Sequence, residues 1–119
     1  MTETERGGLD AFTKNLSAGR AACLAGQLTL LEFSELVNRA DVVVTGDSFP
    51  MHLAAAHKRP LVALFGPTDE SRVGPRGSGQ VVRADVGCRR CYRMVQCDRR
   101  CIEKITVDQV LAAVKRVTA

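Results

Sequence analysis

The sequence is poor in aromatic side chains and lacks any long apolar run. It contains no tryptophan, one tyrosine and four phenylalanines among 119 residues. Proteins that bind single-stranded nucleic acid usually stack bases on such rings, so the shortage weighs against that class. No run reaches the roughly 20 apolar residues of a bilayer-spanning helix, and the polar start, Met1 to Gly8, has no apolar signal core. We therefore expect a cytoplasmic protein.

The length and the apolar fraction, 45%, are ordinary for one globular domain. We expect a single domain over 1–119, with a weakly ordered start over 1–26, an α/β core over 27–85, a Cys-rich segment over 86–104 and a helix over 105–119. The net charge of +4 is uneven, because residues 72–104 hold nine basic and three acidic side chains. Such a patch attracts phosphate-bearing ligands, nucleic acid or an anionic membrane face, and charge alone does not choose among them.

The apolar patterns predict alternating helices and strands. Helices are expected over Glu3–Leu16, from Thr29 to Ala40, over Pro50–His57 and after Thr106, and strands over Ala21–Leu24, Asp41–Thr45, Leu61–Phe65 and Gln80–Ala84. Thr29 and Thr106 each precede a Glu or Gln by three residues, which is the spacing of a capping box. The runs after Asp41 and from Leu61 are continuously apolar, as in central parallel strands. Repeated strand–helix–strand units indicate an α/β fold with a doubly wound parallel sheet.

The final helix is expected to pack by an apolar stripe. Its members are Val107, Val110, Leu111, Val114 and Val117. Their spacing follows the helical period, so we expect all five to face the core.

A polar turn at Asp47 and Ser48 leaves the valine-rich strand and enters a helix. Ligands of open α/β sheets lie beyond the carboxyl ends of the strands, where helix N–H groups and the positive dipole end meet an anion. A diphosphate suits this place, with Ser48 donating to a phosphate oxygen and His52 pointing to the same mouth. Asp47 would repel phosphate, so it suits sugar hydroxyls. The alternative is that Asp47 and Ser48 only cap the helix and that His52 is a surface residue.

Four cysteines lie close together, as Cys88-x2-Cys91-x5-Cys97-x3-Cys101. Thiolates at such spacing suit a tetrahedral zinc or an iron–sulfur cluster, and flanking arginines would offset their charge. The role would be structural, because four protein ligands leave no open position for a substrate. Free or disulfide-linked thiols are the alternative.

Two blocks of sequence, DSFPMHLAAA from Asp47 and PLVALFGPTD from Pro60, stand at the centre of the chain. Together with GQLTLLE from Gly26 and the Cys-rich segment, they resemble glycosyltransferase family 9, the ADP-heptose:lipopolysaccharide heptosyltransferases. The resemblance implies an incomplete C-terminal lobe of a two-lobed GT-B glycosyltransferase: a partial Rossmann-like sheet with a Cys-rich loop and a C-terminal helix. Such an enzyme transfers heptose from ADP-heptose to lipopolysaccharide core without a metal.

By the same resemblance, Asp47 holds the sugar of the ADP-sugar donor, and Ser48, the Phe49 backbone and His52 hold its diphosphate. The family has glycine where Phe49 stands, and a phenyl ring hinders the close backbone approach that glycine permits. The acceptor and the catalytic base belong to an N-terminal lobe that this chain lacks. We therefore expect no catalytic residue, no transfer by the chain alone, and a companion chain that supplies that lobe. A peripheral position at the inner face of the inner membrane agrees with this role.

Two other functions stay open at this stage. A metal-stapled basic module would bind nucleic acid or a partner chain through the arginines from Arg89 to Arg100, with steep salt dependence. This hypothesis assigns no function to the polar turn at Asp47. An inert remnant would instead recruit a partner chain through an apolar sheet edge.

Overall fold

The computed structural model describes residues 3–16, 19–67, 79–84 and 101–119. The chain forms two compact units, Met1–Phe33 and Ser34–Ala119. In the described part of the chain, no helix has both the length and the apolar character needed to cross a bilayer.

The first unit holds helix α1, Glu3–Lys14, close to its predicted bounds. The strand predicted over Ala21–Leu24 was wrong, since these residues form no strand. The run instead enters a turn, in which Gln27 N donates to Leu24 O at 3.1 Å and Gly26 adopts a φ of 74°. This left-handed conformation suits glycine. Four apolar residues without a neighbouring ladder are too few to hold a strand.

Helix α2, Leu30–Arg39, begins at the predicted capping box. Thr29 N donates to Glu32 Oε2 at 2.7 Å, and Glu32 N donates to Thr29 Oγ1 at 3.2 Å. The backbone hydrogen bond from Thr29 lowers the pKa of the Glu32 carboxyl. The reciprocal pair satisfies two N–H groups that a helix start otherwise leaves unpaired, which fixes where α2 begins.

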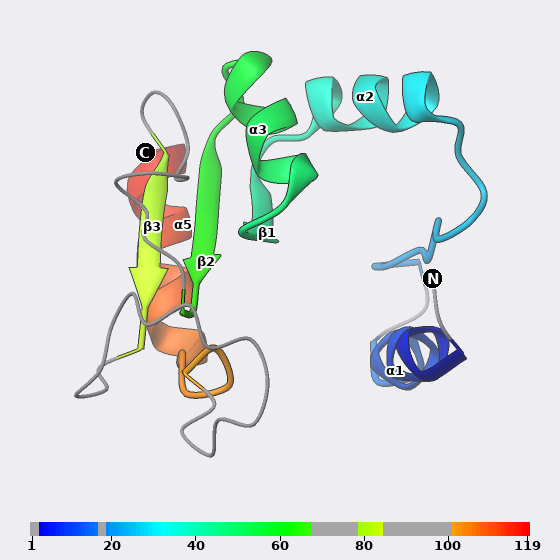
Figure 1. Cartoon of the computed structure of the whole chain (residues 1–119), viewed down its shortest axis with the longest axis horizontal. Helices are drawn as coiled ribbons and strands as arrows, with labels where there is room; N and C mark the ends of the chain where they lie inside the picture. Colours follow the sequence, from blue (N-terminus) through cyan, green and yellow to red (C-terminus); the bar gives the residue numbers. More distant parts are fainter. Residues whose placement is uncertain (1–2, 17–18, 68–78, 85–100) are drawn as a thin grey trace. The chain divides into compact units, whose positions relative to one another are not determined.

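The second unit contains a parallel sheet of three strands in the order β1-β2-β3 (Figure 1). β1 is Val43–Gly46, β2 is Leu61–Phe65 and β3 is Gln80–Arg83. Helix α3, Phe49–Ala56, connects β1 to β2. The predicted α/β class is confirmed, and the sheet is consistent with part of a Rossmann-like fold.

Helices cover both faces of the sheet. Val62 and Val82 form a core cluster with Ala113 of helix α5, Val107–Thr118. The other face of β2 is also buried, and α3 packs on β1 and β2 with Met51 and Ala54 fully buried. Figure 1 shows α3 in front of the sheet and α5 behind it. Alternating side chains of β2 therefore meet a helix on each side, as expected of a continuously apolar strand.

The stripe predicted for the last helix was partly wrong. Ala113 is fully buried against the sheet, whereas Val107 and Leu111 are 74% and 50% exposed. A small residue at the contact lets the helix approach the sheet closely, so the buried face is centred on Ala113 rather than on the larger side chains. Val114 and Val117 pack at its margin, as predicted.

Candidate functional site

The carboxyl ends of the three strands lie at one edge of the sheet. The register pairs Gly46 with Leu64 and Phe65 with Arg83, so β1, β2 and β3 end side by side. Their arrowheads point the same way in Figure 1. Ligands of open parallel sheets lie beyond this edge. The turn predicted to bind a ligand follows β1 at this position.

At the N-terminus of α3, the protein itself provides hydrogen-bond acceptors for only some of the backbone N–H groups. Ser48 is the N-cap residue with an extended backbone, yet its side chain makes no capping hydrogen bond. Pro50 has no N–H, and Met51 N donates to Ser48 O at 3.1 Å. Within the described ranges nothing accepts the Phe49 N–H. The alternative in which Ser48 only caps the helix is therefore weakened. In the first turn of α3, the Phe49 N–H is the backbone donor that the described residues leave unpaired.

The side chains of this turn are accessible to a ligand. Phe49 is 54% exposed, so its ring does not fill the site. Ser48 and His52 are also exposed, whereas Asp47 is half-buried and already has an interaction partner. The four residues predicted to bind the donor thus lie in one turn and the helix start after it. The Ser48 hydroxyl and the His52 imidazole are exposed to solvent.

Arg83 adds a positive charge that the sequence interpretation treated only as part of the basic segment. Its guanidinium lies 5.5 Å from the centre of the Phe65 ring, and Nη1 donates to Gly66 O. Gln109 Nε2 donates to Arg83 O at 3.4 Å. These contacts hold the cation at the carboxyl edge of the sheet. Its place next to the end of the strand predicted over Gln80–Ala84 was the available signal.

Cys101 is the one member of the cysteine cluster within the described residues. It is a half-buried free thiol, while Cys88, Cys91 and Cys97 lie outside the described ranges. A Cβ added to Gly66 would lie 3.2 Å from Cys101 Sγ. The end of the Cys-rich segment therefore packs against the carboxyl end of β2.

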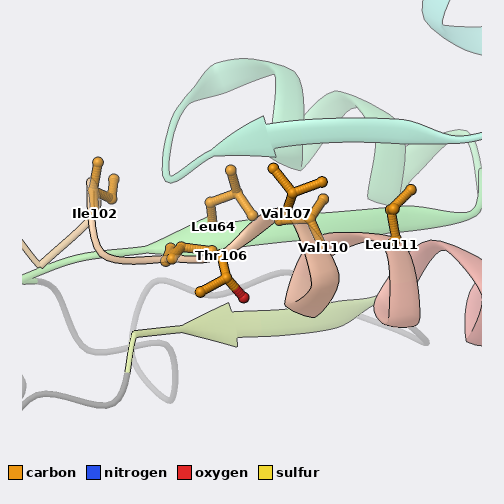
Figure 2. Close-up of a pocket in the computed structure, with 7 residues that line it drawn as sticks. Leu64, Ile102, Thr106, Val107, Val110 and Leu111 are labelled. Atoms are coloured by element: carbon orange, nitrogen blue, oxygen red, sulfur yellow. The ribbon is translucent and has the colours of Figure 1, made fainter.

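A separate pocket of 260 Å³ lies beside the start of α5 (Figure 2). It is lined by Leu64, Ile102, Ile105, Thr106, Val107, Val110 and Leu111. Thr106 is the one polar side chain of the lining, and its Oγ1 accepts a hydrogen bond from Gln109 N at 3.2 Å. Such a surface suits apolar groups and does not suit a diphosphate.

His57, the other histidine, has a structural contact. Its Nε2 lies 2.9 Å from Ser34 Oγ, which joins the end of α3 to α2. His57 N also donates to Leu53 O at 3.0 Å at the helix C-terminus. The residue is thus engaged at the C-terminal end of α3, away from the turn at Ser48.

The model of glycosyltransferase family 9 (heptosyltransferase) matches residues 3–102. Lipooligosaccharide heptosyltransferase 2 of Haemophilus influenzae is 48% identical to this chain over 52 residues, which are 44% of this chain and 15% of that protein. Lipooligosaccharide heptosyltransferase 2 of Campylobacter jejuni serotype O:2 is 27% identical over 99 residues, which are 79% of this chain and 31% of that protein.

Lipopolysaccharide heptosyltransferase 2 of Escherichia coli K12 is 40% identical over 65 residues, which are 54% of this chain and 19% of that protein. The matched segments thus span less than a third of each of these relatives. No solved structure gives a significant match.

Proposed function

Because the chain belongs to glycosyltransferase family 9, the heptosyltransferase family, we propose that its carboxyl sheet edge binds the donor of a lipopolysaccharide heptosyltransferase. The donor is an ADP-sugar, with ADP-heptose as the specific case. The observation that carries this proposal is the start of α3, where Ser48 does not cap the helix with its side chain and stays exposed. A helix start with unsatisfied donors attracts a diphosphate.

Each residue of the turn has a chemical role in the proposal. Ser48 Oγ and the Phe49 N–H donate to phosphate oxygens, and His52 adds a donor when its ring is suitably protonated. Asp47 accepts hydrogen bonds from sugar hydroxyls. Arg83 lies at the same sheet edge. Its fixed positive charge attracts the negatively charged diphosphate toward that edge.

Transfer itself needs groups beyond the donor site. The proposal assigns acceptor binding and the catalytic base to a companion chain or segment with the N-terminal lobe, so the chain alone binds donor without transferring sugar. The acceptor is a lipid, so the assembled enzyme works at the inner face of the inner membrane. The charge of +6 over residues 72–104 supports this position, because anionic headgroups attract basic segments. Nucleic-acid binding through that segment is not supported.

A nitrogen–proton correlation NMR titration tests donor binding. We expect ADP to shift the amide signals of Ser48, Phe49 and His52, with adenosine as the control that lacks the diphosphate. A Ser48→Ala, His52→Ala double variant should weaken the ADP response while its remaining spectrum stays unchanged. If millimolar ADP leaves these signals in place, the isolated chain does not bind the donor.

We also propose that Cys88, Cys91, Cys97 and Cys101 hold a structural zinc or an iron–sulfur cluster. Four thiolates form a suitable donor set, and the half-buried free thiol of Cys101 would tie the site to the end of β2. Elemental analysis of the purified chain should find zinc or iron in a fixed ratio to protein. Cys97→Ser should abolish that metal content and Cys23→Ser should not. Metal-free wild-type protein, prepared with full reduction and metal present, would contradict the proposal.

A further inference from the structure

Arg83 is held at the carboxyl edge of the sheet by two contacts with the strand next to its own. Its guanidinium lies 5.5 Å from the centre of the Phe65 ring, and Nη1 donates to Gly66 O. Phe65 is also the residue that pairs with Arg83 in the register of β2 and β3. The cation therefore lies against the end of β2, one strand closer to β1 than the strand that carries it.

Strand alternation places this guanidinium on the same face of the sheet as α3. Val62 and Val82 pack with Ala113 of α5, so they face that helix. Successive side chains of a strand point to opposite faces. Phe65 and Arg83 follow these valines by an odd number of residues and therefore point to the other face. Helix α3 packs on that face, over β1 and β2 (Figure 1).

The start of α3 lies at the same edge as the guanidinium. Helix α3 begins at Phe49, shortly after the end of β1. The exposed Ser48 hydroxyl and the Phe49 N–H thus follow β1, while the Arg83 guanidinium lies at the end of β2. Neighbouring strands are about 4.8 Å apart. The two sets of hydrogen-bond donors are therefore separated across the edge by a distance on the order of one strand spacing.

We propose that Arg83 makes this edge select a diphosphate over a monophosphate, with Phe65 as its positioning residue. The inference rests on the proposed donor site and adds a second point of contact to it. One phosphate accepts hydrogen bonds from Ser48 Oγ and the Phe49 N–H, and the other accepts from the Arg83 guanidinium. A monophosphate cannot reach both sets of donors. Because a guanidinium carries five N–H donors, Arg83 can hold Gly66 O and a phosphate oxygen together.

The Phe65 ring fixes the guanidinium before a ligand binds. A long side chain that must be ordered during binding loses conformational entropy, which lowers the affinity. Phe65 is 1% exposed, so the core holds its ring in place, and Arg83 is half-buried. A planar guanidinium stacks on an aromatic face and presents a rigid fork of donors to a phosphate, whereas a lysine ammonium is a flexible point charge. An arginine at this position therefore suits a directed contact.

Isothermal titration calorimetry of the full chain with ADP and with AMP tests the selection. We expect ADP to bind at least about tenfold more tightly than AMP, because the second phosphate adds charge-assisted hydrogen bonds. Arg83→Gln should remove most of this preference. Arg116→Gln is the matched control, since it removes the same charge from an exposed position in the last turn of α5 and should leave the preference in place.

Arg83→Lys separates a directed contact from general electrostatic attraction. Lysine keeps the positive charge but lacks the planar fork of donors. We expect this variant to bind ADP several-fold more weakly than the wild type and to bind AMP with nearly unchanged affinity. Circular dichroism checks that each variant is folded.

The NMR signal of the Arg83 side chain gives a readout that a loss of stability alone does not move. The Phe65 ring shifts the resonance of the Nε–H group beside it, so Phe65→Leu should move this signal and also reduce the preference for ADP. In the wild type, ADP should shift the Arg83 signal more than AMP does at equal saturation.

The outcomes distinguish this inference from the donor site itself. Equal affinity of the wild type for ADP and AMP, or an undiminished preference in folded Arg83→Gln, would overturn the role of Arg83 and leave donor binding at α3 intact. An unchanged Arg83 signal and preference in folded Phe65→Leu would overturn the role of Phe65. Binding of neither nucleotide would overturn the donor site and this inference together.

Discussion

The sulfur of Cys101 lies 3.2 Å from the point where a Cβ on Gly66 would stand, at the carboxyl end of β2. The same point is 3.3 Å from Ile102 Cγ1. Both distances are tighter than ordinary van der Waals contact. The absence of a side chain at Gly66 thus lets the chain between the Cys-rich segment and α5 reach the sheet edge that carries the candidate site.

Gly66→Ala should destabilise the fold by about 1–3 kcal/mol, because the added methyl group would push against Cys101 and Ile102. Urea unfolding followed by circular dichroism measures the change. Gly46→Ala is the matched control, since a Cβ there meets no atom within 4 Å. We expect a much smaller effect from the control. Equal stability of the two variants would show that the contact at Gly66 relaxes without cost.

Thr106→Ala should destabilise the fold by about 1 kcal/mol through the loss of the N-cap of α5. Thr106 Oγ1 accepts from Gln109 N at 3.2 Å, and Thr106 N donates to Gln109 Oε1 at 2.8 Å. Thr118→Ala serves as a control, because Thr118 lies exposed at the last turn of the same helix. The same urea series compares the two, and an equal loss would exclude a specific effect of the cap.

The capping box of α2 should make the stability of the fold depend on pH in the acid range, through the Glu32 carboxyl. The backbone hydrogen bond from Thr29 lowers the pKa of Glu32 below its usual value of 4.5. A folded-state pKa below that of the unfolded chain gives a stabilising contribution that is complete above the unfolded pKa and disappears as pH falls through the folded one. We expect an NMR titration to place the Glu32 carboxyl below 4.5, and Thr29→Pro, which lacks the donor, to raise it.

Glu32→Gln supplies the corresponding stability test, because glutamine does not titrate. Its unfolding free energy should fall less on acidification than that of the wild type. A variant with the same acid dependence as the wild type would assign the acid response to other carboxyl groups.

Local chemistry explains which elements the sequence predicted well. The bounds of Leu61–Phe65 agree with the structure because this strand is buried on both faces and its apolar run ends at Gly66. The helix starts at Thr29 and Thr106 were predictable because a capping box is made within four consecutive residues. Each of these signals needs no information about distant parts of the chain.

The predictions that failed depended on tertiary contacts. Ala21–Leu24 has the apolar character of a strand, but a strand exists only with a neighbour to pair with. The buried face of α5 is centred on Ala113 because of the shape of the sheet surface. Arg83 could not be assigned to the site from its neighbours in sequence, since its contacts with Phe65 and Gly66 arise from strand pairing.

In the proposed donor site, Phe49 is the residue whose substitution should change ADP binding most. The resemblance to the family predicts a glycine at this place, and the Phe49 amide is the first-turn donor that the described residues leave unpaired. Removing the ring and Cβ should let a diphosphate approach that amide closely. We expect Phe49→Gly to tighten ADP binding on the order of tenfold, which corresponds to about one hydrogen bond to a charged group.

Isothermal titration calorimetry with ADP measures this change, and Phe49→Ala separates the effect of the ring from that of Cβ in the same experiment. It removes the ring but keeps Cβ, so an affinity between those of the wild type and Phe49→Gly would show that both the ring and the backbone geometry limit access. The exposed ring also offers a surface on which a ligand could stack. In that case both variants would bind ADP more weakly than the wild type, and the phenyl ring would be a binding group rather than an obstacle.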